Sequence, residues 1–121
     1  MNFILVGIGG FLGAITRYVV GLTTLRYLSV GFPYATLIVN VTGSFCLGLL
    51  VAAGLKEVIS ERTLLFAGVG FLGAYTTFST FSVEVLWLFK EGHHTYAVIN
   101  ILLNPIVAIL AAFAGMKLLT T

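Results

Sequence analysis

Four long runs of apolar residues, separated by short breaks, constrain the fold of this chain more than any other feature. A helix needs about 20 apolar residues to cross the hydrocarbon core of a bilayer, which is about 30 Å thick. The chain has runs of this length at about residues 3–25, 34–54, 63–89 and 95–119. We therefore predict a single transmembrane domain, residues 1–121, built from four membrane-spanning helices.

The composition supports this class of protein and excludes others. Hydrophobic residues make up 60% of the chain and charged residues only 8%, whereas about a quarter of a soluble domain is charged. Disordered chains have low hydrophobicity, and strands of a transmembrane barrel alternate in polarity instead of forming continuous apolar runs. The net charge of +2 gives no basis for nucleic-acid binding. The predicted fold class is an all-α integral membrane protein, a multi-pass protein of the cell (inner or plasma) membrane in contact with the lipid bilayer.

The loop charges give almost no preference for one orientation in the membrane. Lysine and arginine are normally more frequent on the cytoplasmic side, but here they divide almost equally between the two ends of the helices. One end has the N-terminus, Lys56, Arg62 and Lys117, and the other has Arg26 and Lys90, joined by Arg17 if it snorkels from the end of the first helix. We therefore expect that the chain inserts in both orientations and forms an antiparallel dimer. Glycines four residues apart, such as Gly9 and Gly13, favour close helix contacts both within and between subunits.

The third run contains a polar stretch, GAYTTFSTFSVEV at residues 73–85. Hydroxyl side chains in a helix commonly bond to the preceding turn, but five of them together with Glu84 within nine residues require a further explanation. Nearby glycines and the pair Thr76-Thr77 weaken the helix. We expect a broken third helix, whose freed carbonyls must find partners or coordinate an ion. Hydroxyl donors and the positive ring edges of Phe78 and Phe81 suit an anion, so the pattern indicates an ion path without naming the ion.

Two other polar residues within the spans, Arg17 and Asn40, have two interpretations each. Arg17 can anchor the first helix at the membrane interface, or it can attract anions toward a vestibule. Asn40 can bond to another helix, or its amino group can donate to a passing anion. Thr36 lies one turn before Asn40 and would extend the same face of the helix. Asn100 and Asn104 lie within the fourth run.

The chain resembles the Fluc/CrcB family of fluoride channels along essentially its whole length. The matching motifs are Gly9-Gly10-x-x-Gly13-x-x-x-Arg17-Tyr18, Thr36-Leu37-x-x-Asn40 and Gly73-x-x-Thr76-Thr77-Phe78-Ser79-Thr80-Phe81-Ser82-x-Glu84. The resemblance implies a passive, fluoride-selective channel that exports fluoride from the cytoplasm and relieves its toxicity. It also implies an antiparallel dual-topology dimer with two pores and no enzymatic activity.

The resemblance further implies a role for each matching residue. The backbone carbonyls of Gly73 and Thr76 from each subunit would hold a structural sodium ion at the dimer interface. The fluoride pore would be lined by Asn40, Phe78, Phe81, Ser79, Thr80 and Ser82. The vestibule and its polar support would come from Arg17, Thr36, Glu84 and Asn104.

The fourth run departs from the family pattern. Members often have pore-lining hydroxyls at the positions of Val107, Ala108 and Ala112. Pro105 should in addition bend this helix. The missing hydroxyls leave open that the chain is an obligate subunit of a heterodimeric fluoride channel, paired with a paralogous chain.

Two further classes fit the sequence less well. A small dual-topology multidrug exporter would need a carboxylate in its first span, where this chain carries Arg17 instead. An enzyme is not expected either. His93 and His94 lie in a predicted loop, with only Glu91 as a nearby carboxylate.

Overall fold

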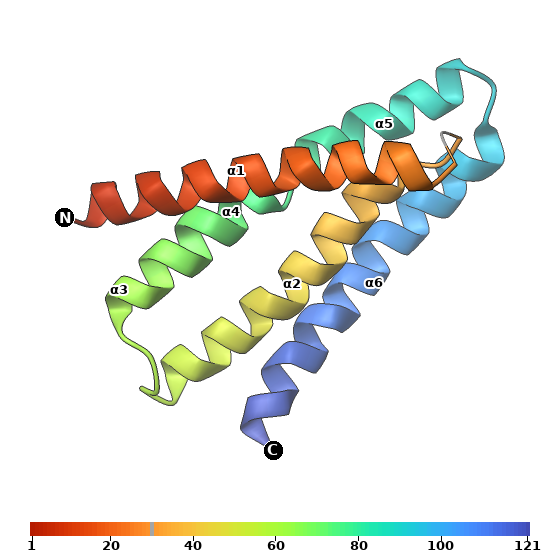
Figure 1. The fold of residues 1–121 in the computed structure, drawn as a ribbon. Coiled ribbons are helices and arrows are strands. Elements are labelled where there is room, and N and C mark those ends of the chain that lie inside the picture. Colours follow the sequence, from red (N-terminus) through yellow and green to blue (C-terminus); the bar gives the residue numbers. More distant parts are fainter. Residues whose placement is uncertain (30) are drawn as a thin grey trace.

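The computed structural model describes residues 1–29 and 31–121, and every element in this part of the chain is helical. The long helices are α1 (Asn2–Tyr27), α2 (Tyr34–Leu55), α5 (Phe78–Lys90) and α6 (His94–Thr120). Three shorter elements lie between α2 and α5, namely α3 (Glu61–Thr63), the π-helix η1 (Leu64–Leu72) and α4 (Gly73–Tyr75) (Figure 1).

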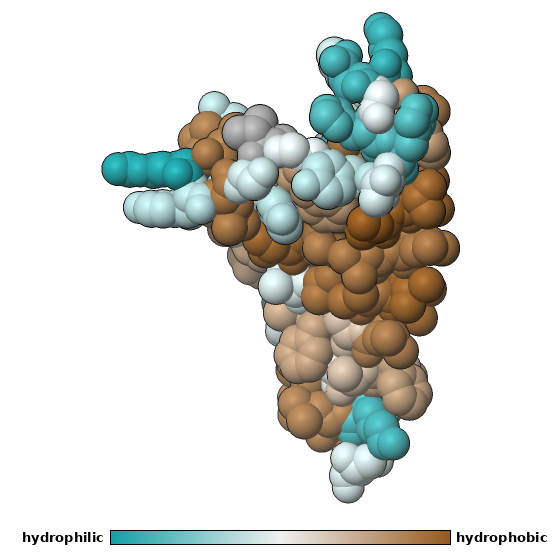
Figure 2. Space-filling model, turned by 90° about the vertical axis from the view of Figure 1, so that its right-hand side faces the viewer, coloured by the Kyte–Doolittle hydropathy of each residue, from teal (hydrophilic) through white to brown (hydrophobic). Residues whose placement is uncertain are grey.

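Four segments of the described chain are long and apolar enough to cross a membrane: Asn2–Tyr27, Tyr34–Leu55, Glu61–Lys90 and His94–Thr120. The third of these contains α3, η1, α4 and α5 in succession. Figure 2 shows an apolar surface that separates hydrophilic ends of the molecule. The prediction of an all-helical, multi-pass membrane protein with four spans is confirmed.

The spans place the chain ends and the connections at two opposite sides of the molecule. Both termini and the α2–α3 connection lie at the left and lower side of Figure 1, and the α5–α6 turn lies at the upper right. Lys56 directly follows α2, while Lys90 ends α5. Positive charge is therefore present at both ends of the bundle, as the distribution of lysine and arginine in the sequence predicted.

Helix α1 crosses η1 at very short range because glycines form the contact. A Cβ atom on Gly9 would overlap with the carbonyl oxygen of Phe66, and one on Gly13 would overlap with that of Phe71. Gly9 and Gly13 therefore allow a close backbone contact within the subunit, which is one of the two kinds of contact that the glycine spacing predicted.

Helices α2 and α6 lie side by side (Figure 1) and also meet through glycines. A Cβ atom on Gly48 would overlap with the Ala112 carbonyl oxygen, and one on Gly115 with the Phe45 carbonyl oxygen. Helix α6 continues through Pro105 without interruption. The α2–α6 pair thus forms a scaffold against which the third span packs.

Candidate functional site

Two residues in extended conformation interrupt the third span near its middle. Helix α4 ends at Tyr75, Thr76 has a ψ angle of 157° and Thr77 one of 122°, and α5 begins at Phe78. An α-helix bonds each N–H to the carbonyl four residues earlier. Extended residues cannot continue this pattern, so the backbone groups around them need other partners.

Asn40 of α2 binds the peptide groups on both sides of Thr77. The Thr77 N–H donates to Asn40 Oδ1 at 2.8 Å, and Asn40 Nδ2 donates to the Thr77 carbonyl oxygen at 2.9 Å. In an uninterrupted helix the same N–H would donate to the Gly73 carbonyl. The Thr77 N–H therefore bonds to Asn40, and the Gly73 carbonyl lacks the donor that it would have in a regular helix.

The Thr77 side chain caps the start of α5. The Thr80 N–H donates to Thr77 Oγ1 at 3.2 Å, and the Thr77 hydroxyl donates to Thr80 Oγ1 at 3.0 Å. Such a cap satisfies one of the free N–H groups at a helix start. In an uninterrupted helix the Thr80 N–H would donate to the Thr76 carbonyl. The carbonyl groups of both Gly73 and Thr76 thus lose their helical donors at this break.

Behind Asn40, two buried asparagines of α6 continue the hydrogen bonding. Asn40 Nδ2 donates to Asn104 Oδ1 at 3.0 Å, and Asn104 Nδ2 donates to Asn100 Oδ1 at 3.3 Å. Both hydrogens of the Asn40 amino group therefore have acceptors within the chain. An anion at Asn40 would have to replace one of these two acceptors. The sequence did not indicate that the Asn40 amino group already has partners within the chain.

Asn100 was not among the predicted site residues, although it is completely buried and belongs to this network. Its spacing of four residues from Asn104 was the available signal, since residues at i and i+4 share a helix face. The contact of both residues with Asn40 depends on the α2–α6 packing, which spacing alone does not indicate.

A groove beside the break contains the predicted aromatic pair. This aromatic groove has a volume of about 210 Å³ and is lined by Asn40, Ser44, Thr76, Thr77, Phe78, Phe81, Asn104, Pro105 and Ala108. The ring centroids of Phe78 and Phe81 are 5.6 Å apart. Phe81 is buried, with 8% of its surface exposed, whereas Phe78 is 76% exposed.

A second groove shares Thr77 with the aromatic groove and contains three of the residues predicted for the vestibule and its support, Arg17, Thr36 and Glu84. This Arg17 groove has a volume of about 340 Å³ and is lined by Ala14, Arg17, Tyr18, Gly21, Ala35, Thr36, Val39, Thr77, Thr80 and Glu84. The Thr36 hydroxyl donates to Glu84 Oε1 at 2.7 Å. Thr77 lines both grooves, so both grooves adjoin the break in the third span.

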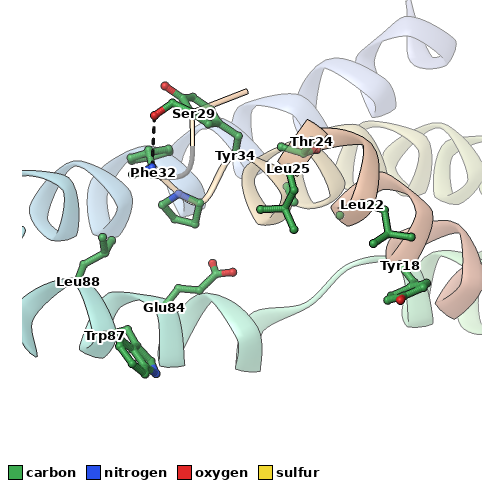
Figure 3. A pocket seen from close by; sticks show the side chains of 14 residues that line it. Tyr18, Leu22, Thr24, Leu25, Ser29, Phe32, Tyr34, Glu84, Trp87 and Leu88 are labelled. Atoms are coloured by element: carbon green, nitrogen blue, oxygen red, sulfur yellow. Dashed lines mark hydrogen bonds between the residues drawn. The ribbon is translucent and has the colours of Figure 1, made fainter. Parts of the chain in front are cut away.

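Glu84 also faces a larger cavity of about 460 Å³, whose walls are mainly apolar and aromatic. Figure 3 shows its side chain projecting from α5 into this cavity, between Leu88 and Tyr18 along the wall. Within the described chain, Glu84 Oε2 is buried and has no hydrogen-bond partner. Glu84 is therefore held through only one of its two carboxylate oxygens.

Three predicted site residues line neither groove: Gly73, Ser79 and Ser82. The Ser82 hydroxyl donates to the Phe78 carbonyl at 3.0 Å, which is the ordinary bond to the preceding turn. Gly73 and Ser79 lie on the exposed surface of the chain. The remaining predicted residues are brought together around the break.

Comparison with known proteins identifies the family. Residues 4–116 match the family described as CrcB-like protein, Camphor Resistance (CrcB). A protein of Idiomarina loihiensis named fluoride-specific ion channel FluC is 47% identical over 121 residues, which cover 100% of this chain and 94% of that protein. Proteins of the same name from Shewanella halifaxensis and Shewanella pealeana are 44% and 43% identical over 117 residues, which cover 97% of this chain and 94% of each protein. The resemblance seen in the sequence motifs is confirmed, and this chain belongs to the CrcB family of membrane proteins.

Proposed function

We propose that this chain forms a passive, fluoride-selective channel that exports fluoride from the cytoplasm across the cell membrane. Relatives at 41–47% identity over at least 97% of this chain carry the name fluoride-specific ion channel FluC. The observation that carries the proposal is the aromatic groove. It places two phenylalanine rings and two amide side chains beside a break in a membrane-spanning helix.

The chemistry of the two grooves supports a path for a small anion. Arg17 lines one groove, where its positive charge would raise the local concentration of anions. In the other groove, the ring edges of Phe78 and Phe81 carry partial positive charge. Fluoride would replace Asn104 Oδ1 as the acceptor for the Asn40 amino group, and the Thr80 hydroxyl would supply a further donor near Thr77.

The proposed channel is an antiparallel dimer with two pores. Phe78 is 76% exposed in the single chain, and Gly73 is also exposed, although both lie in the middle of a membrane span. A second copy packed against the break would cover both residues and complete the wall of the aromatic groove. Similar positive charge at the two ends of the bundle is compatible with both orientations in the membrane.

We further propose that the Gly73 and Thr76 carbonyls from both subunits hold a sodium ion at the dimer axis. Asn40 and Thr77 Oγ1 take the N–H donors that these carbonyls would receive in a regular helix. Unwound backbone carbonyls at membrane depth are typical ligands of sodium. When bound, the cation would offset the repulsion between carbonyl dipoles that converge from two chains.

A second candidate is an obligate subunit of a heterodimeric fluoride channel. Ala108 lines the aromatic groove at a position where family members often carry a hydroxyl. A paralogous partner chain could then supply the missing donors on this wall. Fluoride flux by the purified chain alone distinguishes the two candidates.

Export in cells is tested in a bacterial strain that lacks its own fluoride channel. We expect expression of this chain to restore growth at a fluoride concentration that stops the parent strain. The exposed Phe3, which is 93% exposed at the start of α1, offers a control, because Phe3→Ile should rescue growth equally well. Absence of rescue at normal membrane levels of the protein would contradict export by the lone chain.

A further inference from the structure

Three asparagine side chains connect α6 to the break in the third span. Asn100 and Asn104 of α6 bond to each other, Asn104 bonds to Asn40 of α2, and Asn40 bonds to both sides of Thr77. Asn100 is 0% exposed and Asn104 is 3% exposed. Bulk water therefore cannot replace the hydrogen bonds that Asn100 and Asn104 form in this network.

These hydrogen bonds fix the orientation of all three asparagine side-chain amides. The Thr77 N–H and carbonyl oxygen require that Asn40 present Oδ1 to the first and Nδ2 to the second. The remaining Asn40 hydrogen requires the oxygen of Asn104, whose amino group then faces Asn100 Oδ1. A flipped Asn104 amide would oppose donor to donor at Asn40 and acceptor to acceptor at Asn100.

Stability alone does not explain a polar residue at position 100. The Asn100 amino group is buried and has no hydrogen-bond partner in the described part of the chain. An unpaired buried donor carries a desolvation cost that an apolar side chain avoids. What Asn100 does supply is the acceptor that holds Asn104 in its orientation toward Asn40.

We propose that Asn100 and Asn104 are positioning residues that form a latch. The latch keeps Asn40 hydrogen-bonded to the Thr77 backbone and so preserves the break in the third span. If Asn40 released Thr77, the Thr77 N–H could return to the Gly73 carbonyl and α4 could extend across the break. The latch therefore keeps the Gly73 carbonyl available. Its consequence for sodium binding rests on the cation site proposed above, whereas the latch itself rests on the hydrogen bonds.

Amide exchange at Thr77, measured by NMR on the full-length protein, tests the latch directly. Asn100→Leu and Asn104→Leu remove its acceptors and donors, and we expect the Thr77 N–H to exchange about tenfold faster in both variants, the effect of losing about one buried hydrogen bond. Ser44→Ala is the matched control. Ser44 lines the aromatic groove from α2 but forms no hydrogen bond with Thr77 in the described chain, so exchange should stay unchanged.

A conservative variant separates the latch from general packing. Asn100→Asp keeps an oxygen at the acceptor position, and because burial disfavours the charged carboxylate, a neutral carboxyl O–H takes the place of the unpartnered amino group, so Thr77 exchange should remain within about twofold of wild type. In the wild type, the side-chain amino protons of Asn40 and Asn104 should also exchange slowly. Rapid exchange of these protons would overturn the latch even if the leucine variants did not fold.

A sodium measurement tests the consequence without any measurement of flux. Replacement of sodium by N-methylglucamine should lower the thermal unfolding midpoint of the wild type, and this difference should shrink in Asn100→Leu. Unchanged Thr77 exchange in folded Asn100→Leu and Asn104→Leu would overturn the latch. Normal exchange behaviour together with an absence of fluoride flux would instead contradict the proposed function and leave the latch in place.

Discussion

Thr77 holds the two halves of the third span in place through all of its polar groups. Its N–H and carbonyl oxygen bond to Asn40, and its hydroxyl bonds to Thr80 as the N-cap of α5. The residue is also 8% exposed, so these bonds are shielded from water. A single residue thus caps the start of α5 and diverts the donors of two carbonyls.

Removal of the Thr77 hydroxyl should destabilise the protein without removing its bonds to Asn40. Thr77→Val keeps the shape of the side chain but loses the cap, which costs about 1 kcal/mol of unfolding free energy. Ser82→Ala is the control, because the Ser82 hydroxyl only bonds back to Phe78. Thermal unfolding in detergent provides the comparison, and equal stability of Thr77→Val and wild type would contradict the capping role.

Substitution of the aromatic pair should reduce fluoride flux. Phe78→Ile and Phe81→Ile remove the ring edges, and a loss of about 1.4 kcal/mol in ion stabilisation would lower the flux about tenfold. Phe3→Ile, at an exposed position outside both grooves, should conduct normally. Flux that stays at the wild-type level in both pore variants would remove the aromatic pair from the ion path.

At the level of elements, glycine contacts determine how closely α1 approaches the third span. The Gly9 and Gly13 positions lie against backbone oxygens of Phe66 and Phe71, so no side chain fits between the helices. Gly7 lies on the same helix, but an added Cβ there would meet no atom within 4 Å. The two kinds of glycine allow a matched test on one helix.

Gly13→Ala should lower stability, whereas Gly7→Ala should not. The added methyl group at position 13 forces the backbones apart, at a cost of about 1–3 kcal/mol. At position 7 the same change improves helix propensity by up to about 1 kcal/mol. Unfolding midpoints of the two variants measure the difference, and equal midpoints would contradict the close α1–η1 contact.

The sequence predicted the elements better than their hydrogen bonds. Apolar run length placed the four spans, and the family motifs singled out Asn40 and the aromatic pair. The partner of the Thr77 backbone could not be read from the sequence, because it comes from a different helix, 37 residues away. For the same reason the role of Asn100 was not predicted, since its acceptor function depends on Asn104 and Asn40 together.

At the scale of the whole molecule, the face seen in Figure 2 is apolar between its hydrophilic ends, and Lys56 and Lys90 place positive charge at both ends of the bundle. The Lys/Arg distribution is the main determinant of membrane orientation. A chain without a clear bias should insert both ways, which an antiparallel dimer requires.

Topology can be measured with a single cysteine added after Thr121 in a Cys46→Ser background. We expect a membrane-impermeant reagent to label about half of the protein in intact cells, as dual insertion implies. Two additional lysines at the C-terminus should shift the labelled fraction strongly toward one value and abolish dimer function. Labelling of all or none of the unmodified chain would contradict dual topology.

Fluoride efflux from liposomes that contain only this purified chain tests the central claim most directly. A fluoride-selective electrode should record rapid efflux once the charge is balanced by a potassium ionophore, while a chloride electrode under matched conditions should record almost none. Efflux of fluoride alone would support a homodimeric, selective channel. Absence of fluoride efflux from liposomes with verified folded protein would contradict it, and equal efflux of chloride would contradict its selectivity.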